Sequence, residues 1–197
     1  MCVCLRLRRV CLCLRRWGSV GNGVLGMIYE QVLRQGGDPM LQEASVFFEG
    51  VRVVFFGALR RLARRLEAEG IPYALIGGLA LAEHRYPRLT EGIDLLLTPI
   101  GLERLQYRLA GRGHRPALEG AQKTFRDVET GVRVEIITTG EFPGDGMRKP
   151  VSFPDPAASG VTFEVEGIRV MTLGRLVELK LASGMSVPHR LRDLADV

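Results

Sequence analysis

The chain has 197 residues, enough for one domain with a substantial core and a small appendage. Its 46% hydrophobic and 25% charged residues are ordinary for a globular protein. The net charge of +5 does not indicate a nucleic-acid-binding surface, because five arginines lie in residues 1–16 and the other 22 basic residues balance 22 acidic ones.

Residues 1–26 differ in composition from the rest of the chain. They hold no acidic residue and all four cysteines, which form two Cys-x-Cys pairs at Cys2, Cys4, Cys11 and Cys13. Such pairs can bind a soft metal, but no histidine completes a shell, so we interpret residues 1–26 as a disordered extension. The cysteine-free body is compatible with a reducing compartment, and no apolar run reaches the ~18 residues of a membrane span. We therefore expect a cytoplasmic protein that does not contact a membrane.

Residues 27–69 are predicted to be an N-terminal helical segment. The clearest periodicity runs from Glu43 to Glu69, where apolar residues recur every three or four positions, at Phe55, Leu59, Leu62 and Leu66. The other side of this helix carries Arg60, Arg61, Arg64 and Arg65. We interpret these arginines as a solvated face, with RNA contact as the alternative.

Residues 70–197 are predicted to be the main domain. We expect strands over residues 72–76, 92–98, 123–128, 132–138, 161–165 and 168–171. Helices are expected over residues 77–83, 102–109, 173–182 and 188–197. The interleaving predicts an α/β (α+β) domain with a mixed β-sheet and helices on one face. The last helix has no terminator, so we expect the natural protein to continue beyond Val197.

A glycine pair and an acidic residue suggest a site for phosphate and metal in the first strand-helix-strand unit. Gly77-Gly78 separates an apolar strand from a helix, where unhindered backbone N–H groups can meet phosphate oxygens. Asp94 follows in the next strand, two residues after Gly92 and on the same face. Mg²⁺ prefers carboxylate ligands, and two such ions can clamp the reacting oxygens of nucleotidyl transfer.

A further acid, Glu135, stands alone in the apolar segment 132–138. A buried carboxylate there would be costly without a metal or partner, which favours a role in the same site. The alternative is an ion pair between Glu135 and Arg133 at the surface of the sheet.

The ordered set of motifs resembles the polymerase β-like nucleotidyltransferases. Gly77-Gly78-x13-Gly92-Ile93-Asp94-Leu95 is similar to their glycine pair, short helix and Asp-hydrophobic-Asp strand. More narrowly, the chain resembles the AbiEii-type toxins of type IV toxin–antitoxin systems, whose later lysine and Asp-x-x-Asp segment are similar to Lys180 and Arg190–Asp196. The resemblance implies a nucleotidyltransferase fold, a Mg²⁺ cofactor and a nucleoside triphosphate donor. It also implies tRNA, another RNA or a protein as acceptor, and a cognate antitoxin or toxin as partner.

The residues and the resemblance together predict a set of site residues. The catalytic residues are Asp94, Glu135 and Lys180; the metal ligands are Asp94 and Glu135; and the nucleotide-binding residues are Gly77, Gly78, Thr90 and Lys180. The alternative for Lys180 is a solvated lysine beside Glu178. Arg88 and Thr90 are also expected to orient the metal-binding strand, with a surface turn as the alternative. Arg190, Asp193 and Asp196 share a helical face and are interpreted as an ion-pair network. The loop over residues 140–149 is either a lid, with Arg148 and Lys149 near the phosphates, or a mobile surface loop.

Gly92 stands where the resemblance implies the first metal-binding aspartate. The adjacent Glu91 should project to the opposite face of the strand. We therefore expect triphosphate binding to persist while transfer is slow or absent, and the alternative function is a module that binds a nucleotide or partner without catalysis. A Gly92→Asp substitution is expected to supply the missing acid with little steric risk and to raise turnover.

Overall fold

The computed structural model describes residues 38–86, 90–109, 113–118 and 120–197. The predicted extension over residues 1–26 and the predicted site residue Arg88 lie outside these ranges. The chain divides into two compact units, residues 1–50 and 51–197, and the site belongs to the second. In the described part of the chain, no helix has both the length and the hydrophobicity needed to cross a bilayer.

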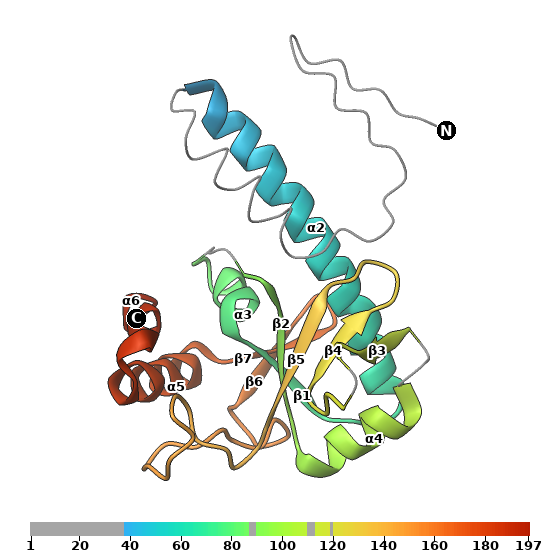
Figure 1. Cartoon of the computed structure of the whole chain (residues 1–197), viewed down its shortest axis with the longest axis vertical. Helices are drawn as coiled ribbons and strands as arrows, with labels where there is room; N and C mark the ends of the chain where they lie inside the picture. The colour runs from blue at the N-terminus through green and yellow to red at the C-terminus, as the bar shows by residue number, and fades with distance from the viewer. Residues whose placement is uncertain (1–37, 87–89, 110–112, 119) are drawn as a thin grey trace. The chain divides into compact units, whose positions relative to one another are not determined.

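The second unit is built on one mixed sheet of seven strands (Figure 1). The strands are β1 (Tyr73–Ile76), β2 (Gly92–Leu97), β3 (His114–Pro116), β4 (Thr124–Asp127), β5 (Arg133–Thr138), β6 (Thr162–Val165) and β7 (Ile168–Met171). Their order is β3-β4-β5-β2-β1-β7-β6. Strand β2 is parallel to β5 and antiparallel to β1, while β1 is parallel to β7. The predicted α/β class with a mixed sheet is confirmed, and β3 is a strand that the sequence pattern did not indicate.

The helices agree in position with the sequence prediction and differ mainly at their ends. They are α2 (Asp38–Ala68), α3 (Gly77–Glu83), α4 (Pro99–Leu109), α5 (Leu173–Ser186), the 3₁₀ helix η1 (Pro188–Arg190) and α6 (Leu191–Ala195). Helix α2 ends at a glycine turn in which Gly70 has a φ of 61°. Helix α5 runs past the predicted end at residue 182, and the Ser186 hydroxyl donates to the Ala182 carbonyl in its last turn.

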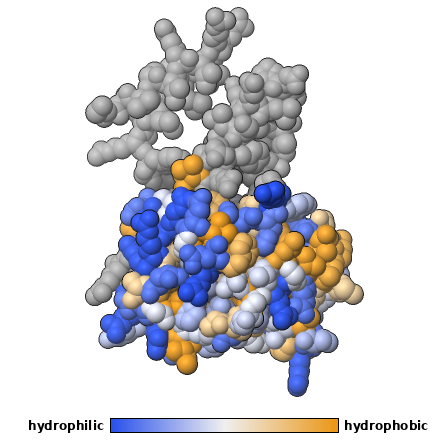
Figure 2. Space-filling model, turned by 180° about the vertical axis from the view of Figure 1, so that it is seen from behind, coloured by the Kyte–Doolittle hydropathy of each residue, from blue (hydrophilic) through white to orange (hydrophobic). Residues whose placement is uncertain are grey.

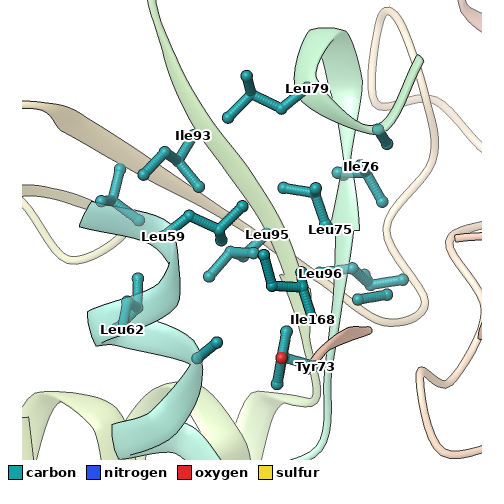
Figure 3. Packing of buried hydrophobic residues seen from close by; sticks show 14 of the residues in the cluster. Leu59, Leu62, Tyr73, Leu75, Ile76, Leu79, Ile93, Leu95, Leu96 and Ile168 are labelled. Carbon is teal, nitrogen blue, oxygen red and sulfur yellow. The ribbon is translucent and has the colours of Figure 1, made fainter. Parts of the chain in front are cut away.

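The core forms where α2 packs on one face of the sheet. Figure 3 shows Leu59 and Leu62 of α2 beside Ile93 and Leu95 of β2, and all four side chains are buried. Truncating such a leucine to alanine typically costs about 2–5 kcal/mol. Because side chains alternate along a strand, Asp94 points to the opposite face from Ile93 and Leu95.

Ion pairs also join α2 to the sheet. Arg61 donates to Asp127 at the end of β4 (2.7 Å), and Arg60 pairs with Glu166 between β6 and β7. The predicted solvated face is confirmed for Arg60, which is 45% exposed, whereas Arg61 is 30% exposed and binds the buried Asp127. The hydrophobic spacing located the core face of the helix, but the partners of its arginines come from distant hairpins.

Candidate functional site

Asp94 and Glu135 lie opposite each other on neighbouring strands. The register of the parallel pair β2–β5 matches Asp94 with Glu135, and both side chains are half-buried on the same face of the sheet. Paired residues on adjacent strands are separated by roughly 5 Å at the backbone. The sheet therefore brings together the two acids that the sequence analysis selected.

The turn between β1 and α3 holds the Asp94 carboxylate. Gly77 has a φ of 68°, in the left-handed region that favours glycine. A Cβ atom on Gly77 would lie 2.9 Å from Asp94 Cγ and closer still to Oδ2, so Asp94 occupies the space that a side chain would need. The positive φ and the closeness of Asp94 are each sufficient reason for glycine at position 77, so this glycine is not by itself evidence of a bound ligand. Gly78 is buried in the first turn of α3.

A polar hollow of about 430 Å³ opens beside the two acids. It is lined by Thr90, Glu91, Gly92, Asp94, Arg133, Glu135, Arg190 and Arg192. Three basic and three acidic side chains thus surround one space, together with Thr90. Glu91 lines this space beside Asp94, contrary to the expectation that it projects to the opposite face of the strand. Gly77, Gly78 and Lys180, which were also predicted to bind nucleotide, are not among these lining residues.

Gly92 is held close to the neighbouring strand. It pairs with Arg133 in the β2–β5 ladder, and a Cβ on Gly92 would lie 2.8 Å from the Arg133 carbonyl oxygen. A real Cβ almost never comes so close to a backbone atom, so any side chain here would force the strands to move. The Thr90 hydroxyl donates to the Gly92 carbonyl (2.9 Å) and stabilises the entry to β2. The expectation that aspartate fits at position 92 with little steric risk is therefore wrong.

Glu135 is paired with a cation of its own strand. The Arg133 guanidinium donates to Glu135 Oε2 over 2.8 Å, and the Glu135 side chain is 46% exposed. The premise of a costly buried acid is wrong, since alternation places Glu135 on the half-open face. The surface pair between Arg133 and Glu135, which the sequence left as the alternative, is present in the structure.

The donor set does not fit a site for two divalent ions. Gly92 contributes no ligand, and the carboxylate of Glu135 is already bound by a guanidinium. Among the residues that the structure describes, no group of three or more His, Cys, Asp or Glu side chains is arranged to hold a metal ion. The pair of Asp94 and Glu135 therefore lacks the third acid that the resemblance implies at position 92.

Lys180 binds two aspartates at the end of the chain. Its ammonium donates to Asp193 Oδ1 (3.0 Å) and Asp196 Oδ2 (2.6 Å), and the lysine is 8% exposed. The interpretation of Lys180 as a solvated lysine beside Glu178 is wrong, because Glu178 pairs with Arg175. The predicted role in catalysis and nucleotide binding would require Lys180 to act through this network.

Asp193 of this network is held in its ionised form. Burial alone would raise the pKa of Asp193, but hydrogen bonds from Ser183 and Lys180 outweigh it and bring the pKa below its usual value. Arg190 lies 3.7 Å from the same carboxylate. The expected ion-pair network of the last helices is thus present, and it holds η1 and α6 against α5.

The loop after β5 makes polar contacts both within itself and with residues outside it. Lys149 pairs with Asp145 and donates to the Pro143 carbonyl (2.6 Å), and its side chain is 15% exposed. Glu141 pairs with Lys123 and accepts from the Thr138 hydroxyl (2.6 Å). Lys149 is therefore engaged inside the loop and does not line the hollow, contrary to the lid interpretation.

Sequence reasoning missed Arg190 and Arg192 as residues of the hollow. Both lie in the segment after α5, about 100 residues from β2, and their place depends on the reversal of the chain between α5 and α6. The signal available in the sequence was the run Arg190-Leu191-Arg192, of which only Arg190 was interpreted, as a member of an ion-pair network.

The chain is similar to several solved structures. No protein-family model and no curated protein matches it. A candidate nucleotidyltransferase from Thermotoga maritima (TM1012) is 21% identical, with a TM-score of 0.48, over 75% of this chain and 93% of that one. The antibiotic-resistance factor ANT(2'')-Ia, in solution, is 13% identical with a TM-score of 0.48, over 75% and 82% of the two chains. Its crystal structure with adenylyl-2''-tobramycin gives 13% identity and a TM-score of 0.44, over 77% and 85%. Identities and TM-scores this low do not place the chain in a family.

Proposed function

We propose that the chain is a nucleotide-binding protein of the nucleotidyltransferase type, and that the hollow between β2, β5 and α6 takes the phosphates of a nucleoside triphosphate. The observation that carries this proposal is the hollow itself, where in-register Asp94 and Glu135 face Arg133, Arg190 and Arg192. Guanidinium groups bind phosphate oxygens through paired, charge-assisted hydrogen bonds. The resemblance of the β1–α3–β2 motif to the nucleotidyltransferases supports the same assignment.

Nucleotidyl transfer is expected to be slow or absent. The donor set lacks an acid at Gly92, and the Arg133 guanidinium already binds Glu135. If transfer occurs, the resemblance implies Mg²⁺ as cofactor, an RNA end such as that of tRNA or a protein as acceptor, and a role in a toxin–antitoxin pair. The aligned carboxylates of Asp94 and Glu135 are the observation that favours this second candidate.

Equilibrium binding tests the proposed function. Each labelled nucleoside triphosphate is titrated against wild type, Arg192→Ala and Arg104→Ala, where Arg104 is an exposed arginine on α4 outside the hollow. We expect wild type and Arg104→Ala to bind alike and Arg192→Ala to bind about tenfold more weakly, as for one lost charge-assisted hydrogen bond. Absence of binding by every triphosphate would contradict the proposal.

An incorporation assay tests the second candidate. Each labelled triphosphate is incubated with Mg²⁺, total RNA and the protein, beside an Asp94→Asn variant. Label transferred to RNA or to protein by wild type, and lost in the variant, would show that the chain is an active transferase and that our expectation of impaired transfer is wrong.

A further inference from the structure

The hollow supplies its own fixed cations. Arg133 comes from β5, and Arg190 and Arg192 come from η1 and α6 on the other wall. Arginine remains protonated at any physiological pH and offers five N–H donors in a planar fork that matches phosphate. A site lined in this way can neutralise phosphate oxygens without a bound metal ion.

Arg133 is bound to one of the two acids that were predicted to hold a metal ion. Its guanidinium already neutralises Glu135 through the 2.8 Å hydrogen bond. The backbone of the same residue blocks a side chain at position 92, because its carbonyl oxygen would lie 2.8 Å from a Cβ there. The hydrogen bond to Glu135 and the close approach to Gly92 therefore both disfavour a metal site made of several carboxylates. They also place the permanent positive charge of Arg133 beside the acids.

Arg190 and Arg192 are the cations with the most freedom to meet a ligand. Both side chains are exposed, and the ion pair of Arg190 with Asp193 is long, at 3.7 Å. No ion pair of Arg192 is found with any residue that the structure describes. The segment that carries both arginines is anchored by the Lys180–Asp193 and Lys180–Asp196 pairs, so their backbone is positioned before a ligand arrives.

The acids of the hollow make it possible to distinguish binding by a metal ion from binding by the arginines. Glu91, Asp94 and Glu135 balance the three arginines, so the hollow is formally neutral when the acids are ionised. If the acids bound phosphate through a metal ion, removal of a carboxylate would weaken phosphate binding. If the arginines bind the phosphate directly, removal of a nearby carboxylate should strengthen phosphate binding, because the negative charges of carboxylate and phosphate repel each other.

We propose that this hollow recognises a polyphosphate chain through Arg133, Arg190 and Arg192 and requires no divalent cation to do so. The inference rests on the proposed function, since it specifies how the triphosphate of the nucleotide is held. This mode of binding differs from that of a site in which carboxylates hold metal ions and the metal ions bind the polyphosphate.

Calorimetric titration with inorganic tripolyphosphate, in EDTA and again in excess Mg²⁺, tests the inference. We expect binding in EDTA, weakened about tenfold in Arg192→Ala and unchanged in Arg104→Ala. Arg133→Ala should also weaken binding, and Asp94→Asn should bind as tightly as wild type or more tightly. Circular dichroism of each variant shows whether weaker binding results from unfolding of the variant. If Arg192→Ala or Arg133→Ala is unfolded, Arg190→Ala takes its place.

The outcomes distinguish the inference from the proposed function. Binding that appears only with Mg²⁺ and is lost in Asp94→Asn would overturn metal-independent recognition and leave nucleotide binding intact. Binding in EDTA that Arg192→Ala and Arg104→Ala weaken equally would assign it to general surface charge and overturn the inference. If neither tripolyphosphate nor any nucleoside triphosphate binds with or without Mg²⁺, both the inference and the proposed function are wrong.

Discussion

The close approach of Gly92 to the Arg133 carbonyl decides what a substitution at position 92 can do. We predict that Gly92→Asp lowers the free energy of unfolding by about 1–3 kcal/mol, as is typical of overpacking, and does not raise nucleotide incorporation. The cause is the added Cβ, which would lie 2.8 Å from a backbone oxygen that cannot rotate away. Urea unfolding and the incorporation assay measure the two effects.

Gly92→Ala is the matched control for this prediction. It adds the same Cβ without a charge, so a steric cause requires the two variants to lose similar stability. An aspartate variant as stable as wild type, with faster incorporation, would restore the original sequence-based expectation for Gly92.

Loss of Lys180 should be costly to stability. Lys180→Met removes the ammonium that pairs with Asp193 and Asp196, whose side chains are only 16% and 6% exposed. Removing one partner of a buried ion pair typically costs about 3–5 kcal/mol. Because the pKa of Asp193 is lowered, the stability from this pair is present at neutral pH and is lost as pH falls below about 4.

Chemical denaturation at neutral and acidic pH measures the cost of Lys180→Met. The control is Arg175→Met on the same helix, which breaks an exposed pair with Glu178 and should cost about 0–1 kcal/mol. If Lys180→Met abolished triphosphate binding while leaving the unfolding free energy unchanged, Lys180 would be a ligand contact and not a structural anchor.

At the scale of elements, the contact between α5 and α6 positions the arginines of the hollow. Gly184 allows this contact, because a Cβ there would lie 2.6 Å from Leu194 Cγ and 3.0 Å from the Leu194 backbone nitrogen. We predict that Gly184→Ala displaces α6, lowers the unfolding free energy by about 1–3 kcal/mol and weakens triphosphate binding. Denaturation and the binding titration measure both effects.

Gly174→Ala provides the control within the same helix. A Cβ on Gly174 meets nothing within 4 Å, so alanine there should be neutral or stabilise by up to about 1 kcal/mol through helix propensity. Equal behaviour of the two alanine variants would show that the packing of α6 on α5 does not position Arg190 and Arg192.

At the scale of the whole molecule, a buried histidine should make stability depend on pH. His114 on β3 is 2% exposed, and neither ring nitrogen has a hydrogen-bond partner. Burial lowers the pKa of His114, and nearby Arg65 and Arg61 lower it further, while Asp127 opposes them. The His114 ring therefore takes up a proton less readily in the folded chain than in the unfolded chain.

The sign of the pH effect follows from this shift. As pH falls below about 6.5, the unfolded chain takes up a proton that the folded chain resists, so the unfolding free energy decreases. The slope stays below about 1.4 kcal/mol per pH unit, the value for a full proton of difference between the two states. Unfolding curves between pH 5 and pH 8 should show this decrease in wild type and a flatter profile in His114→Leu. An unchanged profile in the variant would assign the pH dependence to other groups.

The exposed hydrophobic side chains of the described residues do not by themselves indicate a further binding partner. Figure 2 shows hydrophilic residues over much of the face it displays, with hydrophobic residues among them. The largest exposed hydrophobic side chains, including Tyr107 on α4 and Met185 on α5, are distributed over several elements. The hollow beside β2 and β5 therefore remains the best-supported place for a ligand.

The sequence by itself determined most of the elements and the face of β2 on which Asp94 lies. Periods of two and of three to four residues are local properties, so strands β1, β2 and β5 and helices α2 and α5 could be predicted closely. Alternation along β2 placed Asp94 on the same face as Gly92, but the apolar residues around Glu135 suggested a buried acid, and short β3 carried too few residues for a pattern. Only the tertiary structure decided which groups these residues meet. The register of β2 against β5 sets Gly92 against the Arg133 carbonyl, and the return of α6 on α5 gives Lys180 its two aspartates. Such contacts depend on how the elements pack, and a shift of one residue in the register of β2 against β5 would replace the contact of Gly92 with Arg133.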